Sequence, residues 1–220
     1  MAPMMGGMGF GTEVIYSFVI ILSSLMIYFA TKELYELSSY KGIKYFRLAF
    51  LFFAIAYFFR SFIKFVMFYF GIGDMRYFQH DIFFGIATLI IFSYFSSMAI
   101  FYLLQSVLYK KINGKMIYIF HLLAFILSLI ILVSRNPSTI ILVNTLLLAV
   151  VFIAYFFAHK NSKKNSLSVI YGLLAIFWTV NFLDIIIPNF FQSFQLLIYL
   201  VSICIFLVIL YKVLRKVGAN

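Results

Sequence analysis

The chain has 220 residues, of which 65% are hydrophobic and only 10% are charged, and its net charge is +11. Soluble domains usually carry about 25% charged residues, and a soluble fold of this length has too little interior to hide so many apolar side chains. The composition therefore excludes an ordinary soluble domain. It predicts an integral membrane protein whose apolar side chains face a lipid bilayer.

Seven apolar segments follow one another, each long enough to cross a hydrocarbon core of about 30 Å at ~1.5 Å per residue. They comprise residues 13–31, 45–70, 82–108, 116–134, 138–158, 167–187 and 191–211. The prolines all lie outside these segments, at Pro3, Pro137 and Pro188, where they interrupt no helix. The sequence thus predicts an all-α, polytopic membrane protein, a bundle of seven transmembrane helices.

Lysine and arginine are distributed unevenly over the connections between these segments. Four lie in residues 31–47, three in 109–115, three in 159–166 and three after residue 211. The other connections hold only Arg76 and Arg135. Because basic connections stay on the cytoplasmic side of a membrane, we expect the N-terminus outside and the C-terminus in the cytoplasm. The expected location is the cell membrane, as a multi-pass protein.

The sequence predicts a single membrane domain with short ends. Residues 1–12, rich in Met and Gly, are expected to form a flexible extracytoplasmic tail, residues 13–211 the seven-helix domain, and residues 212–220 a short basic cytoplasmic tail. The first apolar segment lacks the basic flank and cleavage site of a signal peptide, so we expect it to be retained. Anionic lipid headgroups at the cytoplasmic face are the expected partners of the basic connections.

Polar and ionisable side chains inside the apolar segments are the candidates for function, because lipid makes them costly. Those at a similar predicted depth, in the outer half of the membrane or at its outer boundary, are Tyr57, Arg60, Lys64, Asp81, Asn144, Trp178, Asn181 and Asp184. Arg60 and Lys64 are one helical turn apart, as are Asn181 and Asp184, so each pair shares a helix face. We expect an outward-facing polar pocket, floored by Arg60 and Asp184.

Two purely structural interpretations of the same residues stay open at this point. A guanidinium and a carboxylate can form a two-pronged ion pair, so Arg60 and Asp184 could simply tie two helices together. Buried pairs of this kind are often retained for structural specificity rather than for ligand binding. Lys64 could extend its long side chain to the outer lipid headgroups and take no part in a pocket.

Several kinds of chemistry do not fit the sequence. His80 is predicted near one membrane face, and His121 and His159 near the other, so the three cannot converge on one zinc ion. A retinal protein needs a lysine within its seventh helix, and residues 191–211 contain none. The basic residues are spread over short connections, which is not a nucleic-acid groove. We expect no metal, no cofactor, no nucleic acid and no catalytic residues.

Two classes of function remain. We expect a non-catalytic receptor- or sensor-like module, or a subunit of a complex, that works with another membrane subunit or a soluble partner. The alternative is a small transporter or channel for an ion or small polar solute. Its first and last three helices could form a parallel 3+1+3 repeat, since Tyr57 precedes Arg60 by three positions, as Trp178 precedes Asn181. The scarcity of ionisable residues in the inner half favours reception.

Overall fold

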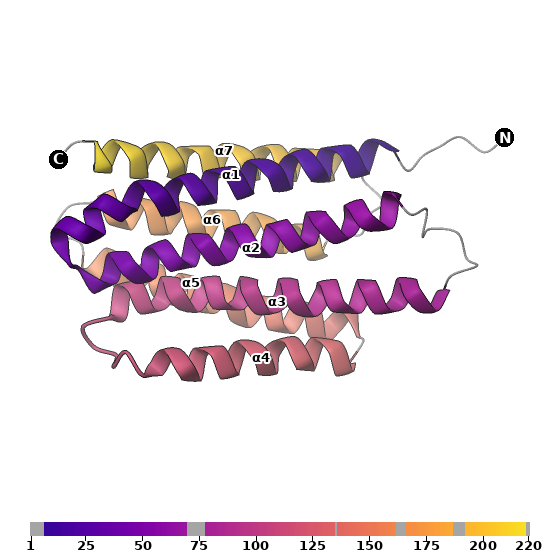
Figure 1. Ribbon diagram of the computed structural model, residues 1–220, viewed down its shortest axis with the longest axis horizontal. Helices are drawn as coiled ribbons and strands as arrows, with labels where there is room; N and C mark the ends of the chain where they lie inside the picture. Colours follow the sequence, from indigo (N-terminus) through magenta and orange to yellow (C-terminus); the bar gives the residue numbers. More distant parts are fainter. Residues whose placement is uncertain (1–6, 70–77, 135, 162–165, 187–191, 219–220) are drawn as a thin grey trace.

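The computed structural model describes residues 7–69, 78–134, 136–161, 166–186 and 192–218, with the side chains of residues 7–10, 63–64, 66–69, 78–89, 137, 161, 166 and 192–193 outside the description. These parts of the chain form helices and contain no strand (Figure 1). The helices are α1 (Gly7–Ser38), α2 (Lys41–Tyr69), α3 (Phe78–Leu108), α4 (Met116–Ser134), α5 (Pro137–Asn161), α6 (Ser166–Ile186) and α7 (Gln192–Val217).

All seven helices are long and apolar enough to cross a membrane, which confirms the predicted all-α bundle of seven spans. Large apolar side chains cover the outside of the bundle. Phe18, Leu122 and Phe156, for example, are 57%, 58% and 62% exposed. Water would penalise such a surface, whereas a bilayer accepts apolar side chains and demands that backbone hydrogen bonds be made within the helix. The chain is a multi-pass membrane protein.

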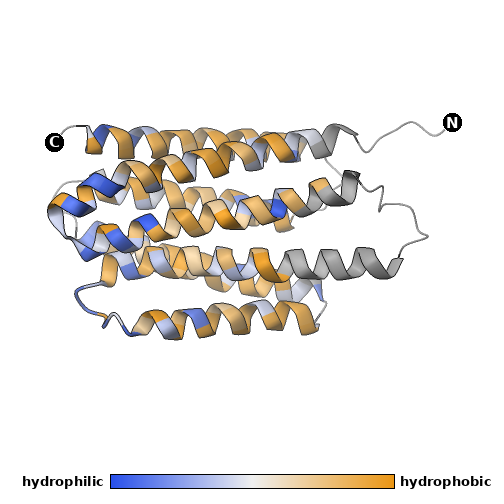
Figure 2. Ribbon diagram, viewed as in Figure 1, coloured by the Kyte–Doolittle hydropathy of each residue, from blue (hydrophilic) through white to orange (hydrophobic). Residues whose placement is uncertain are grey.

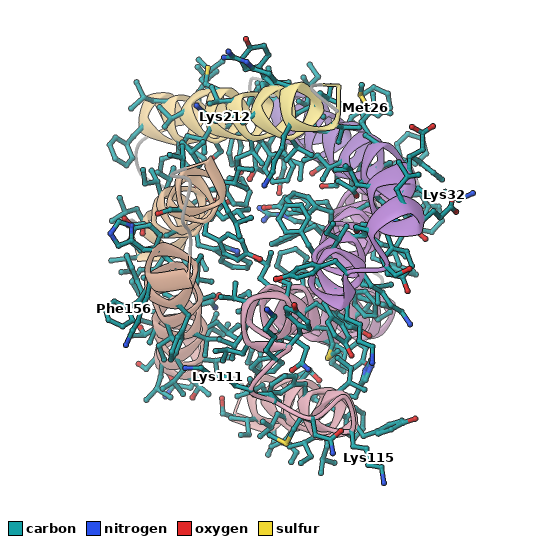
Figure 3. The ribbon with its side chains drawn as sticks, turned by 90° about the vertical axis from the view of Figure 1, so that its left-hand side faces the viewer. Met26, Lys32, Lys111, Lys115, Phe156 and Lys212 are labelled. Carbon is teal, nitrogen blue, oxygen red and sulfur yellow. The ribbon has the colours of Figure 1, made fainter. Side chains whose placement is uncertain are left out.

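The helix–helix contacts form a ring of six helices, and α4 lies outside it (Figure 3). The order of neighbouring helices around the ring is α1, α2, α3, α5, α6, α7, and α7 in turn contacts α1. Helix α4 contacts α3 and, less extensively, α5. It buries only one stripe of side chains, Phe120, Ala124, Ser128 and Ile131. The ring therefore consists of α1–α3 and α5–α7, and α4 packs on its outside.

Hydrophilic residues gather at the end of the bundle where α1 meets α2 and α3 meets α4 (Figure 2). Helix α7 also ends there, whereas α1 begins at the opposite end (Figure 1). The described basic residues at this lysine-rich end are Lys32, Lys41, Lys44, Arg47, Lys110, Lys111, Lys115, Lys160, Lys212, Arg215 and Lys216. The positive-inside rule predicts that the lysine-rich end faces the cytoplasm.

Helix α1 is longer than predicted at both of its ends. It begins at Gly7, so it includes part of the segment predicted as a tail. At the other end it continues to Ser38, through good helix formers in which Lys32 and Glu36 pair at 3.7 Å. Ser39 then adopts a left-handed conformation, with φ of 50°, and its amide donates to the Tyr35 carbonyl oxygen at 2.8 Å. This is an αL cap that closes the helix.

Helix α7 also extends beyond its predicted end at residue 211. It runs to Val217, and Arg215 and Lys216 lie in its last turn. Cations are favourable there because they face the negative end of the helix dipole. Most of the segment predicted as a basic tail is therefore helical, and its charges have fixed positions relative to the bundle.

Four phenylalanines fill the middle of the ring, and we call them the aromatic layer. Phe50 and Phe53 belong to α2, Phe177 to α6 and Phe206 to α7, and none is more than 1% exposed. The ring centroids of Phe177 and Phe206 are 5.0 Å apart, and those of Phe50 and Phe206 are 6.0 Å apart. Both are favourable edge-to-face contacts. The aromatic layer separates the two ends of the bundle.

Candidate functional site

A cavity of about 200 Å³ lies between α2, α3, α5 and α6, with Ile131 of α4 also in its wall, on the side of the aromatic layer away from the lysine-rich end. The predicted site residues that line it are Tyr57, Arg60, Asn144, Trp178, Asn181 and Asp184. Ser93 and Ser96 of α3 add two hydroxyl groups to its wall. We call it the Arg60 cavity. Residues chosen for their predicted depth on three different helices thus surround one space, while their role in binding stays a prediction.

Two members of the predicted set cannot be placed at this cavity. Lys64 lies in α2 and Asp81 in α3, but the side chains of both lie outside the described residues. The backbone positions agree with the predicted helices. The predicted contribution of Lys64 and Asp81 to a polar pocket therefore stays a prediction.

Arg60 forms an ion pair with a carboxylate that was not in the predicted set. Its Nε and Nη2 atoms donate to Glu13 Oε1 at 3.0 and 2.9 Å, and the Arg60 and Glu13 side chains are 20% and 12% exposed. The carboxylate that pairs with Arg60 is thus Glu13 of α1, while Asp184 lines the same cavity from α6. Helix α1 begins at Gly7, so Glu13 lies within the helix and not at its first residue.

Aromatic rings complete the surroundings of the Arg60 guanidinium. Its Cζ atom lies 5.4 Å from the ring centroid of Phe92 and 5.9 Å from that of Tyr57. A guanidinium is planar and weakly hydrated, so it tolerates aromatic neighbours better than an ammonium group does. Side chains from α1, α2 and α3 therefore hold Arg60 in one position at the cavity wall.

A network of hydroxyl and amide groups lies beside the ion pair. The Tyr16 hydroxyl is 3.0 Å from the Tyr57 hydroxyl and donates to Asn181 Oδ1 at 2.8 Å. Asn181 Nδ2 donates to the Phe177 carbonyl oxygen at 2.8 Å. The Tyr16 ring stacks on Tyr199 of α7, with centroids 4.7 Å apart. Four helices of the ring, α1, α2, α6 and α7, thus meet at this depth.

Tyr16 was missed at the level of the sequence, although a signal for it exists. It follows Glu13 by three positions, so both lie on one face of α1. Tyrosines are frequent in this chain, which contains 16 of them, and a buried tyrosine within an apolar segment does not stand out. Only the complete burial of Tyr16 and its two polar partners distinguish it.

Trp178 places a further donor beside the Arg60 cavity. Its indole Nε1 atom is buried and has no hydrogen-bond partner among the described residues. A buried donor without an acceptor costs about 1–3 kcal/mol. Trp178 lines the cavity, so a ligand with an acceptor oxygen could recover part of that cost.

A second cavity, of about 350 Å³, lies at the lysine-rich end inside the ring of six helices. No sequence pattern predicted it. We call it the lysine cavity, because Lys110 and Lys111 of the α3–α4 connection and Lys216 of α7 line it. Ser106 and Tyr171 also line it, and their hydroxyl groups are hydrogen-bonded to each other.

The other reactive side chains among the described residues do not form a shared site. Among the described residues, no three His, Cys, Asp or Glu side chains come together as a metal site would require. His121 Nδ1 lies 2.8 Å from the Tyr94 hydroxyl, and His159 Nδ1 lies 2.9 Å from the Ser168 hydroxyl. Cys204 is exposed on the outer surface of α7.

Comparison with known proteins gives one informative match. No protein-family model matches the chain, and no solved structure does. An uncharacterized protein of Archaeoglobus fulgidus is 30% identical over 216 residues, which cover 93% of this chain and 92% of that protein. The similarity therefore extends over nearly the full length of both chains.

Proposed function

We propose a function from the residues of this chain, which belongs to the same family as the uncharacterized Archaeoglobus fulgidus protein. In this proposal the chain is a non-catalytic, receptor-like membrane module that binds a small polar or charged solute in the Arg60 cavity. Binding changes the packing of α1 against α2, and a membrane or soluble partner detects that change. The predicted orientation opens the cavity to the outside of the cell membrane.

The observation that carries this function is the ion pair between Arg60 and Glu13. It joins α2 to α1 at the wall of a cavity that Arg60 itself lines. A solute carboxylate or other anion that reaches the guanidinium competes with Glu13 for the same donors. A ligand shifts a conformational equilibrium only through different contacts in the two states, and this competition supplies such a difference.

Size and chemistry favour a small solute with a carboxylate group. At ~30 Å³ for each water of the liquid, a cavity of about 200 Å³ holds roughly seven waters, or one small organic molecule. Arg60 offers a cation, Asp184 a carboxylate, and Asn144 and Asn181 neutral amides. A solute with both a carboxylate and an ammonium or hydroxyl group would find partners for each.

Trp178 makes binding directly measurable, because it is the only tryptophan of the chain. Its fluorescence therefore comes from a single residue, which lines the Arg60 cavity and packs against Phe53 and Phe177. We expect at least one of glycine, alanine, succinate and acetate to change the Trp178 emission of the protein in nanodiscs, saturably. The response should be lost in Arg60→Gln and kept in Lys44→Gln, an exposed residue of the same helix. Unchanged emission with every solute, or an equal response in Arg60→Gln, would argue against solute binding here.

Transport of the same solute is the second candidate, and the lysine cavity is the observation that favours it. The two cavities lie within the same ring, on either side of the aromatic layer. On α6, Tyr171 lines one and Trp178 the other, a separation of about 10 Å along the helix axis. An aromatic layer of this thickness could act as the barrier of an alternating-access cycle.

Flux measurements in proteoliposomes distinguish the two candidates. A transporter should take up the solute that changes Trp178 emission, with saturation, and lose that uptake in Arg60→Gln. A receptor-like module should bind the solute with the same affinity in liposomes and show no uptake above protein-free vesicles. The first result would replace reception by transport as the function.

A further inference from the structure

We propose that the lysine cavity is a second binding site, one that takes an organic anion. The phosphate, sulfonate or carboxylate group of the anion lies among Lys110, Lys111 and Lys216, and its aromatic or apolar body fills the cavity below them. This site is independent of the solute site in the Arg60 cavity, from which the aromatic layer separates it.

The charge around the cavity has one sign. Lys110 and Lys111 at the end of α3 and Lys216 in the last turn of α7 line it, and no acidic residue is among its described lining. At this end of the described chain the acidic residues are Glu33 and Glu36, both exposed on α1, and Glu36 pairs with Lys32. Three cations, from the α3–α4 connection and from α7, therefore line one cavity, which favours an anion there.

One of these cations is held in place by an aromatic ring. Lys111 Nζ lies 5.3 Å from the ring centroid of Phe157 on α5, a cation–π contact. This contact draws the ammonium group from the α3–α4 connection toward α5, the next helix of the ring. Lys115, in contrast, points away from the bundle (Figure 3), so the two lysines of the same connection have different roles.

The body of the cavity is mostly apolar and large enough for a ligand. The side chains that form this wall come from five helices: Leu34, Ile43, Phe46, Val107, Leu167 and Val213. A volume of about 350 Å³ reaches the lower end of the range of roughly 300–1,000 Å³ that is usual for ligand pockets. Inorganic phosphate alone would leave most of this space unfilled, so an anion with an organic body fits better.

The polar groups inside the cavity are neutral hydroxyls. Ser106 and Tyr171 form one buried pair. Tyr40 is 44% exposed, and its partial burial, together with a hydrogen bond to Tyr109, raises its pKa to about 12, so its hydroxyl stays protonated at the pH of a cell. Neutral hydroxyls present no negative charge that would repel an anion.

Gly42 fixes the shape of the cavity. A Cβ atom at this position would lie 2.5 Å from Tyr40 Cε1 and 2.8 Å from the Ser106 carbonyl oxygen. The first turn of α2 can therefore approach α3 this closely only with glycine. The approach sets Tyr40 and Ser106 at the cavity wall before any ligand binds, and such preorganisation lowers the cost of binding.

Phenyl phosphate is a suitable probe, because it combines the anion with a ring. Binding is measured by calorimetry with the protein in nanodiscs of zwitterionic phosphatidylcholine. We expect the dissociation constant to rise at least tenfold in Lys216→Gln and further in the variant K110Q/K111Q/K216Q. Lys212→Gln is the matched control, since this exposed lysine lies one turn earlier on α7 and does not line the cavity. Phenol and inorganic phosphate should each bind more weakly than phenyl phosphate.

A second variant tests the site without changing charge. Val107→Phe fills part of the cavity, so it should weaken phenyl phosphate binding and leave that of inorganic phosphate unchanged. Trp178 emission and thermal unfolding show whether each variant is folded. Equal phenyl phosphate affinity in the wild type and in the triple variant would overturn the proposal. So would phenol binding as tightly as phenyl phosphate, or no measurable binding of phenyl phosphate.

The anion could be a lipid headgroup or a soluble molecule, and nanodisc composition distinguishes them. If an anionic lipid enters the cavity, adding phosphatidylglycerol should raise the apparent dissociation constant of phenyl phosphate, in the wild type but not in Val107→Phe. If the anion is soluble, the lipid should have no effect. Phenyl phosphate binding should persist in Arg60→Gln, so failure of this site and failure of the Arg60 cavity are seen separately.

Discussion

The two cavities of the bundle differ in how far their cations are buried and in whether these cations are paired. In the Arg60 cavity the cation is mostly buried and already bonded to Glu13, beside a hydrogen-bonded network. In the lysine cavity the cations are exposed and share their lining with no acid among the described residues. A ligand of the first cavity must break existing bonds between helices, which couples binding to movement. A ligand of the second can reach its lysines without displacing a carboxylate of the described lining from them.

The aromatic layer keeps these two regions apart, and breaking it should have the largest effect. Phe177→Ala removes a ring that is 1% exposed and contacts Phe206 at 5.0 Å. Because the void would open between the two cavities, we expect the free energy of unfolding to fall by about 4 kcal/mol. Vesicles containing the variant should also leak small solutes. Phe156→Ala, on the lipid-facing side of α5, is the control (Figure 3). If Phe177→Ala and Phe156→Ala lowered the free energy of unfolding equally, the aromatic layer would have no special role.

Loss of the ion pair in the Arg60 cavity should have the second-largest effect. Arg60→Ala takes away the cation that the mostly buried Glu13 carboxylate contacts. Breaking a buried pair from one side typically costs about 3 kcal/mol or more. Thermal unfolding in detergent measures this loss. The double variant Glu13→Gln/Arg60→Met should recover at least half of it, because no charge is then left in the interior. A double variant as unstable as Arg60→Ala would show that the pair contributes little.

The Gly42→Ala variant tests the lysine cavity. The added methyl group would meet Tyr40 Cε1 and the Ser106 carbonyl oxygen, so α2 must move away from α3. Overpacking of this kind costs about 2 kcal/mol. Phenyl phosphate binding should weaken, while the response of Trp178 to its solute is kept. Gly11→Ala is the control, since a Cβ there has nothing within 4 Å. A fully stable Gly42→Ala variant would contradict the close approach.

The smallest effect is expected for the hydroxyl network. Tyr16→Phe keeps the ring that stacks on Tyr199 but removes the donor to Asn181. The free energy of unfolding should fall by about 1 kcal/mol, as for a single buried hydrogen bond. Tyr118→Phe, at a residue that is 74% exposed, should cost nothing measurable. Comparing denaturation of the two variants tests this, and a loss in Tyr118→Phe alone would refute it.

Sequence reasoning found the Arg60 cavity for a physical reason. Ionisable groups are rare inside membrane spans, so Arg60 and Asp184 stand out, and helix geometry predicts their depth. Pairing of Arg60 with Asp184 was one open alternative, and Glu13 was left out of the predicted set because it was taken as a helix boundary. That omission followed from placing the start of α1 six residues later than Gly7. Helix ends are not marked by hydropathy when glycine and methionine precede the apolar run.

The lysine cavity escaped prediction because its residues have another explanation. Lysines at the ends of spans determine topology, and this explanation accounts for Lys110, Lys111 and Lys216 without any pocket. Only the ring arrangement, with α4 outside it, shows that these three lie around one opening. The number and order of the helices were predicted correctly from apolar length. Which helices are neighbours depends on side-chain packing, which no segment reveals alone.

The most direct test measures whether the ion pair controls the position of α1. In a Cys204→Ser background, spin labels at Phe18→Cys on α1 and Ile176→Cys on α6 lie on exposed faces, and electron resonance gives their separation. Adding the solute that changes Trp178 emission should shift this distance by about 2 Å, as for other helix shifts. Glu13→Gln should produce the same shift without solute. An unchanged distance in Glu13→Gln, and in the protein saturated with solute, would contradict the coupling of this cavity to helix movement.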